Sequence, residues 1–89
     1  MNRTIIECGL VKSRADFHDL LARELNFPDW YGGNLDALHD LLTAIGTDTV
    51  LQLHDWPDAE AALGSYGSRV EKVLAFAALK NPHLTIEFC

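Results

Sequence analysis

The sequence predicts an α/β fold in which a three-stranded parallel sheet is packed with about four helices. Three short segments rich in apolar residues indicate strands: "RTIIEC", "TVLQLHD" and "HLTIEFC". Segments with helical spacing of apolar residues separate them, and strands connected through helices pair in parallel. The length of 89 residues predicts that residues 1–89 form a single domain.

The first of these strands, residues 3–8, is followed by a predicted helix and a loop. Ser13 with Asp16 three residues later is a weak capping box that marks a helix start. Apolar residues then follow at helical spacing: Phe17, Leu20, Leu21 and Leu25. The segment "NFPDWYGG" predicts a loop, because Pro28 and a pair of glycines interrupt it.

A second helix is predicted to begin after Asn34, a favourable N-cap residue, and to end at Gly46. Its expected buried stripe consists of Leu35, Leu38, Leu41, Leu42 and Ile45. The opposite side of the helix carries Asp36, His39, Asp40 and Thr43.

The second half of the chain continues with a strand at residues 49–55 and a short helix at 56–63, with Pro57 in its first turn. The buried stripe of the last helix is expected to be Val70, Val73, Leu74, Ala77 and Ala78. Phe76 and Leu79 fall off this stripe. The final strand is expected to point Leu84, Ile86 and Phe88 inward.

Composition and charge narrow the class of protein. The chain is 48% hydrophobic and 22% charged, as in an ordinary globular domain, and no apolar run is long enough for a membrane span. Its first residues lack the apolar stretch of a signal peptide, so we expect a cytoplasmic protein. The net charge of −6 argues against nucleic acid as a direct partner.

The acidic residues are unevenly distributed, because no Lys or Arg occurs between Arg23 and Arg69. This window is either a solvated acidic face that favours solubility or a surface that attracts a basic partner. Two cysteines, Cys8 and Cys89, lie near the two ends of the chain and form no CxxC pair. We therefore expect two free thiols and neither a metal site nor a cofactor.

Catalysis is disfavoured. Asp36 and Asp40 share one exposed helix face, where nothing would raise the pKa of either carboxyl as general-acid chemistry requires. The four histidines are scattered, so a metal site at His39 lacks support from ligand spacing. A small hydrolase that uses His39 with one of these acids remains the enzymatic alternative.

A protein-binding surface agrees better with these residues. Trp30 and Tyr31 are large anchors of the kind that dominate interfaces, although core packing would explain either one equally well. The helix dipole accounts for Asp36 in the first turn. Asp40 lies deeper in the helix, where neither capping nor the dipole favours it, so we expect it to meet a cation on another molecule.

The segment "WYGGNLDALHD", residues 30–40, resembles the signature of the barstar family of bacterial ribonuclease inhibitors. The order of the elements also agrees along the whole chain. The resemblance implies a non-enzymatic intracellular antidote that blocks the active site of a basic ribonuclease or nuclease toxin domain, as a monomer in a 1:1 complex. It implies that the partner-binding surface contains Trp30, Asn34, Asp36, Ala37, His39, Asp40 and Thr43. We also expect Tyr31 and Gly32 of the same loop to belong to it, together with Phe76 as an exposed apolar contact.

Two positions depart from the family's type inhibitor, which has Trp in place of His39 and Glu in place of Phe76. The departures suggest a nuclease different from the type enzyme, such as the toxic domain of an intercellular competition system. The alternative function is an acidic protein-interaction module of the same fold that inhibits nothing.

Overall fold

The computed structural model describes residues 2–89 and confirms the three-stranded parallel sheet. The strand order is β1-β2-β3, and both pairings are parallel. In chain order the elements are β1 (Asn2–Glu7), the 3-10 helix η1 (Cys8–Leu10), α1 (Arg14–Glu24), α2 (Leu35–Thr43), β2 (Thr49–His54), α3 (Trp56–Leu63), α4 (Ser65–Lys80) and β3 (Leu84–Phe88).

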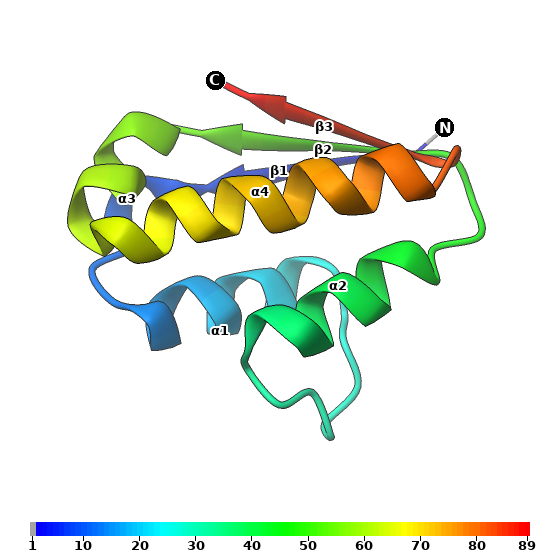
Figure 1. Cartoon of the computed structure of the whole chain (residues 1–89), viewed down its shortest axis with the longest axis horizontal. Helices are drawn as coiled ribbons and strands as arrows, with labels where there is room; N and C mark the ends of the chain where they lie inside the picture. Colours follow the sequence, from blue (N-terminus) through cyan, green and yellow to red (C-terminus); the bar gives the residue numbers. More distant parts are fainter. Residues whose placement is uncertain (1) are drawn as a thin grey trace.

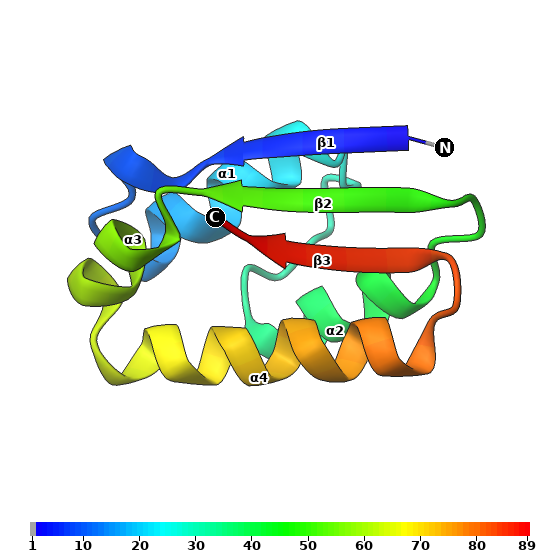
Figure 2. The same ribbon diagram turned by 90° about the horizontal axis from the view of Figure 1, so that it is seen from above.

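The helices form one layer against the sheet. Figure 1 shows α1, α2 and α4 on the same side of the strands, with α3 at the end of the sheet where β2 finishes. In Figure 2 the opposite face of the sheet is turned toward the viewer, and no helix covers it. The exposed residues of α1, α2 and α4 therefore all lie on the same side of the sheet.

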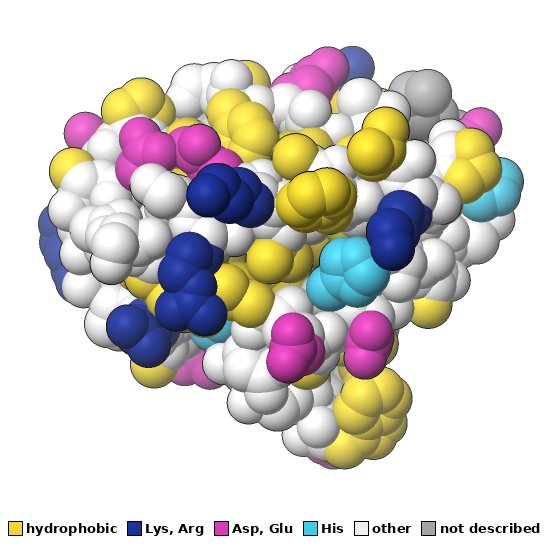
Figure 3. Space-filling model, in the orientation of Figure 1, with side chains coloured by type: hydrophobic (Ala, Val, Ile, Leu, Met, Phe, Trp, Pro, Cys, Tyr) yellow, Lys and Arg dark blue, Asp and Glu magenta, His cyan; other side chains and the backbone are white. Residues whose placement is uncertain are grey.

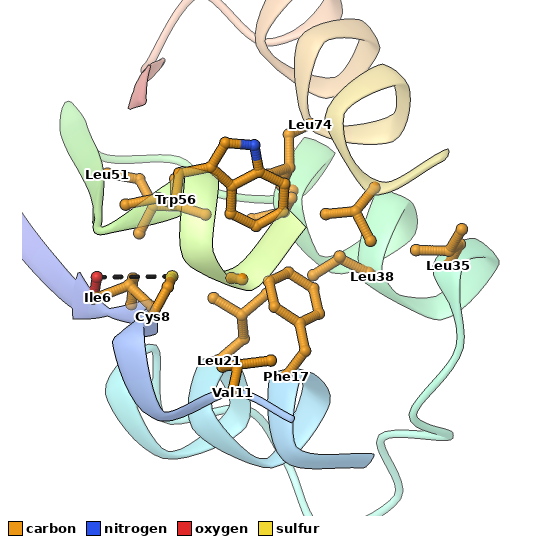
Figure 4. Packing of buried hydrophobic residues seen from close by; sticks show 14 of the residues in the cluster. Ile6, Cys8, Val11, Phe17, Leu21, Leu35, Leu38, Leu51, Trp56 and Leu74 are labelled. Carbon is orange, nitrogen blue, oxygen red and sulfur yellow. Dashed lines mark hydrogen bonds between the residues drawn. The ribbon is translucent and has the colours of Figure 1, made fainter. Parts of the chain in front are cut away.

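The core lies between the sheet and these helices, where the register aligns inward-facing residues. Ile6 pairs with Leu53, and Leu51 pairs with Ile86. Apolar residues of α1, α2 and α4 pack against these strand residues, as Figure 4 shows. The largest fully buried side chains include Phe17, Leu21, Leu38, Leu42, Val70 and Leu74. The predicted helix stripes thus supply the core, with Leu20, Leu25, Leu41, Ile45, Val73 and Ala78 only partly buried.

Two of the predicted helix starts are confirmed by local contacts. The hydroxyl of Ser13 accepts a hydrogen bond from the backbone N–H of Asp16 at 3.2 Å, which caps α1. Pro57 lies in the first turn of α3, where its missing N–H costs nothing. Within residues 2–89, no helix is long and apolar enough to cross a membrane.

The predicted end of the second helix is wrong. α2 ends at Thr43, and Gly46 lies beyond it without a positive φ. The amide of the buried Asn81 donates to the carbonyl oxygens of Leu42 and Ile45, both at 2.9 Å. A side chain distant in sequence therefore satisfies the carbonyls at this helix end, so no glycine is needed there.

The last strand was predicted to point Leu84, Ile86 and Phe88 inward. The prediction is confirmed for Leu84, which is buried, and holds only in part for the two later residues. Ile86 is half-buried and Phe88 remains 42% exposed, so Phe88 is not the buried core residue that was expected. β3 is an edge strand, with β2 as its single neighbour in the sheet. The ring of Phe88 instead packs beside that of Trp56, with 5.4 Å between the centroids.

Both cysteines are free thiols, as predicted. Cys8 is fully buried at the end of β1, where its Sγ donates to the carbonyl oxygen of Ile6 at 3.6 Å. Burial raises the pKa of the Cys8 thiol to about 12. The thiolate, which is the reactive form, is thus disfavoured at Cys8, whereas Cys89 is exposed.

Candidate functional site

α2 presents two carboxylates to solvent from a well-anchored helix. The side chain of Asn34 accepts a hydrogen bond from the N–H of Ala37 at 2.8 Å and so caps the helix as predicted. Leu35, Leu38 and Leu42 fix the opposite side in the core. Asp36 is exposed, and the side chain of Asp40 is 86% exposed. The helix therefore holds both acids in place without neutralising them.

The other predicted residues of α2 are partly exposed around these acids. Nδ1 of His39 lies 3.9 Å from a carboxylate oxygen of Asp40. The Thr43 hydroxyl donates to the carbonyl oxygen of His39 at 2.9 Å, within the helix itself. Ala37, His39 and Thr43 are half-buried, so each leaves part of its surface available on the acidic side of α2.

The two aromatic residues of the preceding loop point in different directions. Trp30 is 73% exposed, whereas Tyr31 is partly buried against the core. The ring of Tyr31 packs beside Phe27 with 4.9 Å between centroids. The sequence alone could not distinguish core packing from an interface role for these two residues. In the structure, core packing explains most of the Tyr31 side chain and does not explain Trp30. Gly32 is exposed between Tyr31 and the positive φ of Gly33.

A buried histidine attaches this loop to the body of the protein. His18 of α1 is 3% exposed, and its ring contacts two tyrosine hydroxyls: Nδ1 lies 2.5 Å from Tyr31 and Nε2 lies 2.7 Å from Tyr66. Burial lowers the pKa of His18. A neutral ring can donate through one nitrogen and accept through the other, so both contacts are satisfied. This role of His18 could not be predicted from the sequence, because a lone histidine carries no positional signal.

Phe76 is 56% exposed on α4, which agrees with the prediction that it lies off the buried stripe. α4 packs beside α2, and Figure 3 shows hydrophobic side chains over α4 on the same face as two acidic side chains over α2. Of the other predicted residues, Trp30, Gly32, Asn34, Asp36 and Asp40 are also exposed. The loop, α2 and α4 thus form one face, called here the acidic face.

The amino-acid sequence matches the family model described as Barstar (barnase inhibitor) over residues 1–88. The chain belongs to the barstar family. It is also similar to the Bacillus subtilis (strain 168) protein named "Putative ribonuclease inhibitor YrdF". The two are 37% identical over 75 residues, which cover 83% of this chain and 82% of the relative.

In this barstar-family protein the acidic face is bordered by two arginines that the sequence analysis missed. Arg14 begins α1 and Arg69 lies in α4, and both line a hollow of about 290 Å³. Asp36, Asn34 and Tyr66 line the same hollow. Within the sequence, Arg14 precedes the acidic window and Arg69 ends it, so only the fold brings them beside α2.

The described residues of this family member give no indication of a metal site. Within residues 2–89, no three His, Cys, Asp or Glu side chains gather in a cluster suited to a metal ion. A second hollow, of about 710 Å³, lies between the start of β1, residues 24–28 and the end of α2. It is lined by neither Asp36 nor Asp40.

Proposed function

We propose that this barstar-family protein is a cytoplasmic antidote or immunity protein. It inhibits a basic ribonuclease or nuclease toxin domain by blocking the active site in a 1:1 complex. The observation that carries the proposal is the exposure of Asp36 and Asp40, one turn apart on a capped helix beside the exposed Trp30. The family description as a barnase inhibitor and the name of the similar B. subtilis protein support the same activity.

The physical argument starts from the substrate of such an enzyme. A ribonuclease cleft is cationic because it must bind a phosphodiester. A carboxylate on a rigid helix can occupy the phosphate position at little entropic cost. We assign this role to Asp40, with Asp36 beside it. The surrounding contacts are assigned to Trp30, Tyr31, Gly32, Asn34, Ala37, His39, Thr43 and Phe76.

The first test is the substitution Asp40→Ala, with Asp58→Ala as a control that removes the same charge from the exposed surface of α3. Loss of a carboxylate that pairs with buried cations costs at least about 2 kcal/mol, roughly thirtyfold in Kd. Inhibition of RNA cleavage by the cognate nuclease is the measurement. The melting temperature should stay level or rise slightly, because like charges at i and i+4 repel.

The cognate nuclease is obtained by affinity capture, with the native protein and the Asp40→Arg variant as baits. A small basic protein with ribonuclease activity, retained by the native bait alone, is the expected result. Capture of the same proteins by both baits would contradict the assignment of the acidic face. Retention of a partner whose RNA cleavage is unaffected would instead favour the non-inhibitory interaction module.

A further inference from the structure

The hollow beside α2 brings together two arginines that are far apart in the sequence. The guanidinium carbon of Arg14 lies 4.4 Å from the centroid of the Tyr66 ring, and that of Arg69 lies 5.6 Å from it. A guanidinium near an aromatic face gains about 0.5–1 kcal/mol at exposed sites. One ring thus attracts two like charges, which partly offsets the repulsion between them.

No carboxylate neutralises these guanidinium groups. Among residues 2–89, the arginine that forms an ion pair is Arg23, with Glu24 at 3.7 Å. Asp36 lines the same hollow as the two arginines, yet it forms no ion pair with either. Positive and negative groups therefore lie side by side on one surface and are left available to a partner.

The platform under the arginines is rigid. Tyr66 is only 6% exposed, and its hydroxyl is bound to Nε2 of the buried His18 at 2.7 Å. Figure 3 shows basic side chains over the beginnings of α1 and α4, on the face that carries the acids of α2. A fixed ring reduces the conformational entropy that the arginines lose when they bind a ligand.

We propose that Arg14 and Arg69 bind a carboxylate of the inhibited nuclease, an Asp or Glu side chain at the rim of its cationic cleft. The guanidinium fork matches the planar carboxylate and can donate two hydrogen bonds to it. RNA is the less suitable anion, because the neighbouring Asp36 and the net charge of −6 repel a polyphosphate. This inference rests on the proposed function and adds a specificity element to it.

The surface would therefore recognise a partner through negative and positive charges together. The partner must present cations opposite Asp36 and Asp40 and an anion opposite the arginines. A nuclease with a uniformly basic rim would place like charges against Arg14 and Arg69 and would be rejected. The surface therefore selects among basic nucleases instead of binding all of them.

The test is the double substitution Arg14→Glu/Arg69→Glu, measured against the captured nuclease. The variant Arg23→Glu/Lys12→Glu is the control. It makes the same charge change at two exposed positions that do not line the hollow. Both variants are more acidic and should approach a basic enzyme equally fast. We expect the double variant to bind the captured nuclease at least about tenfold more weakly than the control, through faster dissociation.

Equal affinity of the double variant and the control would overturn the inference. Arg14→Gln/Arg69→Gln, checked by its melting temperature, excludes misfolding as the cause of a loss, because it removes both positive charges without adding carboxylates beside Asp36. If Asp40→Arg also binds like the native protein, the proposed function fails and this inference fails with it. Binding of a labelled single-stranded RNA that disappears in the double variant would assign the arginines to nucleic acid and would likewise overturn the inference.

Discussion

His18 is the residue whose chemistry most directly links the loop to the body of the protein. Its two ring contacts join Tyr31, next to Trp30, with Tyr66, the platform of the arginine pair. The charged groups around it are Asp19 on its own helix, which raises its pKa against the stronger effect of burial, and the two arginines at Tyr66. One buried imidazole thus supports both ends of the binding surface.

This environment predicts a pH dependence of stability. Burial lowers the pKa of His18 from its ordinary 6.5, so below that value the unfolded chain binds a proton that the folded protein excludes. The free energy of unfolding should therefore decrease as the pH falls through about 6.5 toward the lowered value. His18→Gln should be less stable by about 1–3 kcal/mol at neutral pH, because the tyrosine contacts are damaged.

The measurement is urea denaturation of both proteins at a series of pH values between about 7.5 and 5. The difference in stability between native protein and His18→Gln should shrink as the pH is lowered. His54→Gln, at a partly exposed position on β2, is the matched control for the removal of one imidazole. A His18→Gln profile parallel to that of the native protein would remove His18 as the titrating group.

At the level of elements, local sequence signals identified those features that local contacts determine. Asn34 and Ser13 cap their helices with their own side chains, so the prediction needed only neighbouring residues. The end of α2 escaped prediction because Asn81, from beyond α4, supplies the cap. Trp30 and Tyr31 could not be separated for the same reason, since Tyr31 lies in a loop and its partner His18 lies on α1.

α4 contributes an exposed aromatic residue whose role can be tested separately from the acids. Phe76→Ala should weaken binding to the captured nuclease by more than about 1 kcal/mol, at least fivefold, as truncation of an interface aromatic does. Its stability should change by less than about 0.5 kcal/mol, because the side chain lies outside the core. Leu10→Ala, at an 87% exposed apolar residue of η1, is the control. If the two variants bind equally well, Phe76 is not part of the interface.

At the level of the whole molecule, the parallel sheet and its helical layer were predictable because strand and helix periodicities alternate along the chain. The arrangement of charged residues on the surface could not be predicted from the sequence. The sequence indicates an acidic window without basic residues, whereas the fold places Arg14 and Arg69 at the border of α2. Such proximity depends on which helices pack together, and α1 and α4 are separated in the sequence by α2, β2 and α3.

The net charge of −6 and the exposed acids of α2 predict how binding responds to salt. Opposite charges on the protein and a basic nuclease attract over distances that salt shortens, from a Debye length of about 30 Å at 0.01 M to about 3 Å at 1 M. The association rate should therefore fall by roughly tenfold or more across this range. The dissociation rate should change much less, because the contacts formed in the complex are screened only weakly.

Stopped-flow mixing of the protein with the captured nuclease, with the fluorescence of Trp30 as the signal, gives the association rate and the dissociation rate. Asp58→Ala should reduce the association rate slightly at low salt and leave dissociation unchanged, since it removes only long-range attraction. Asp40→Ala should accelerate dissociation at every salt concentration, since it removes a contact. If salt instead acts mainly on dissociation, the acids of α2 meet the partner through solvent-exposed pairs, and Asp40 does not occupy a closed cationic cleft.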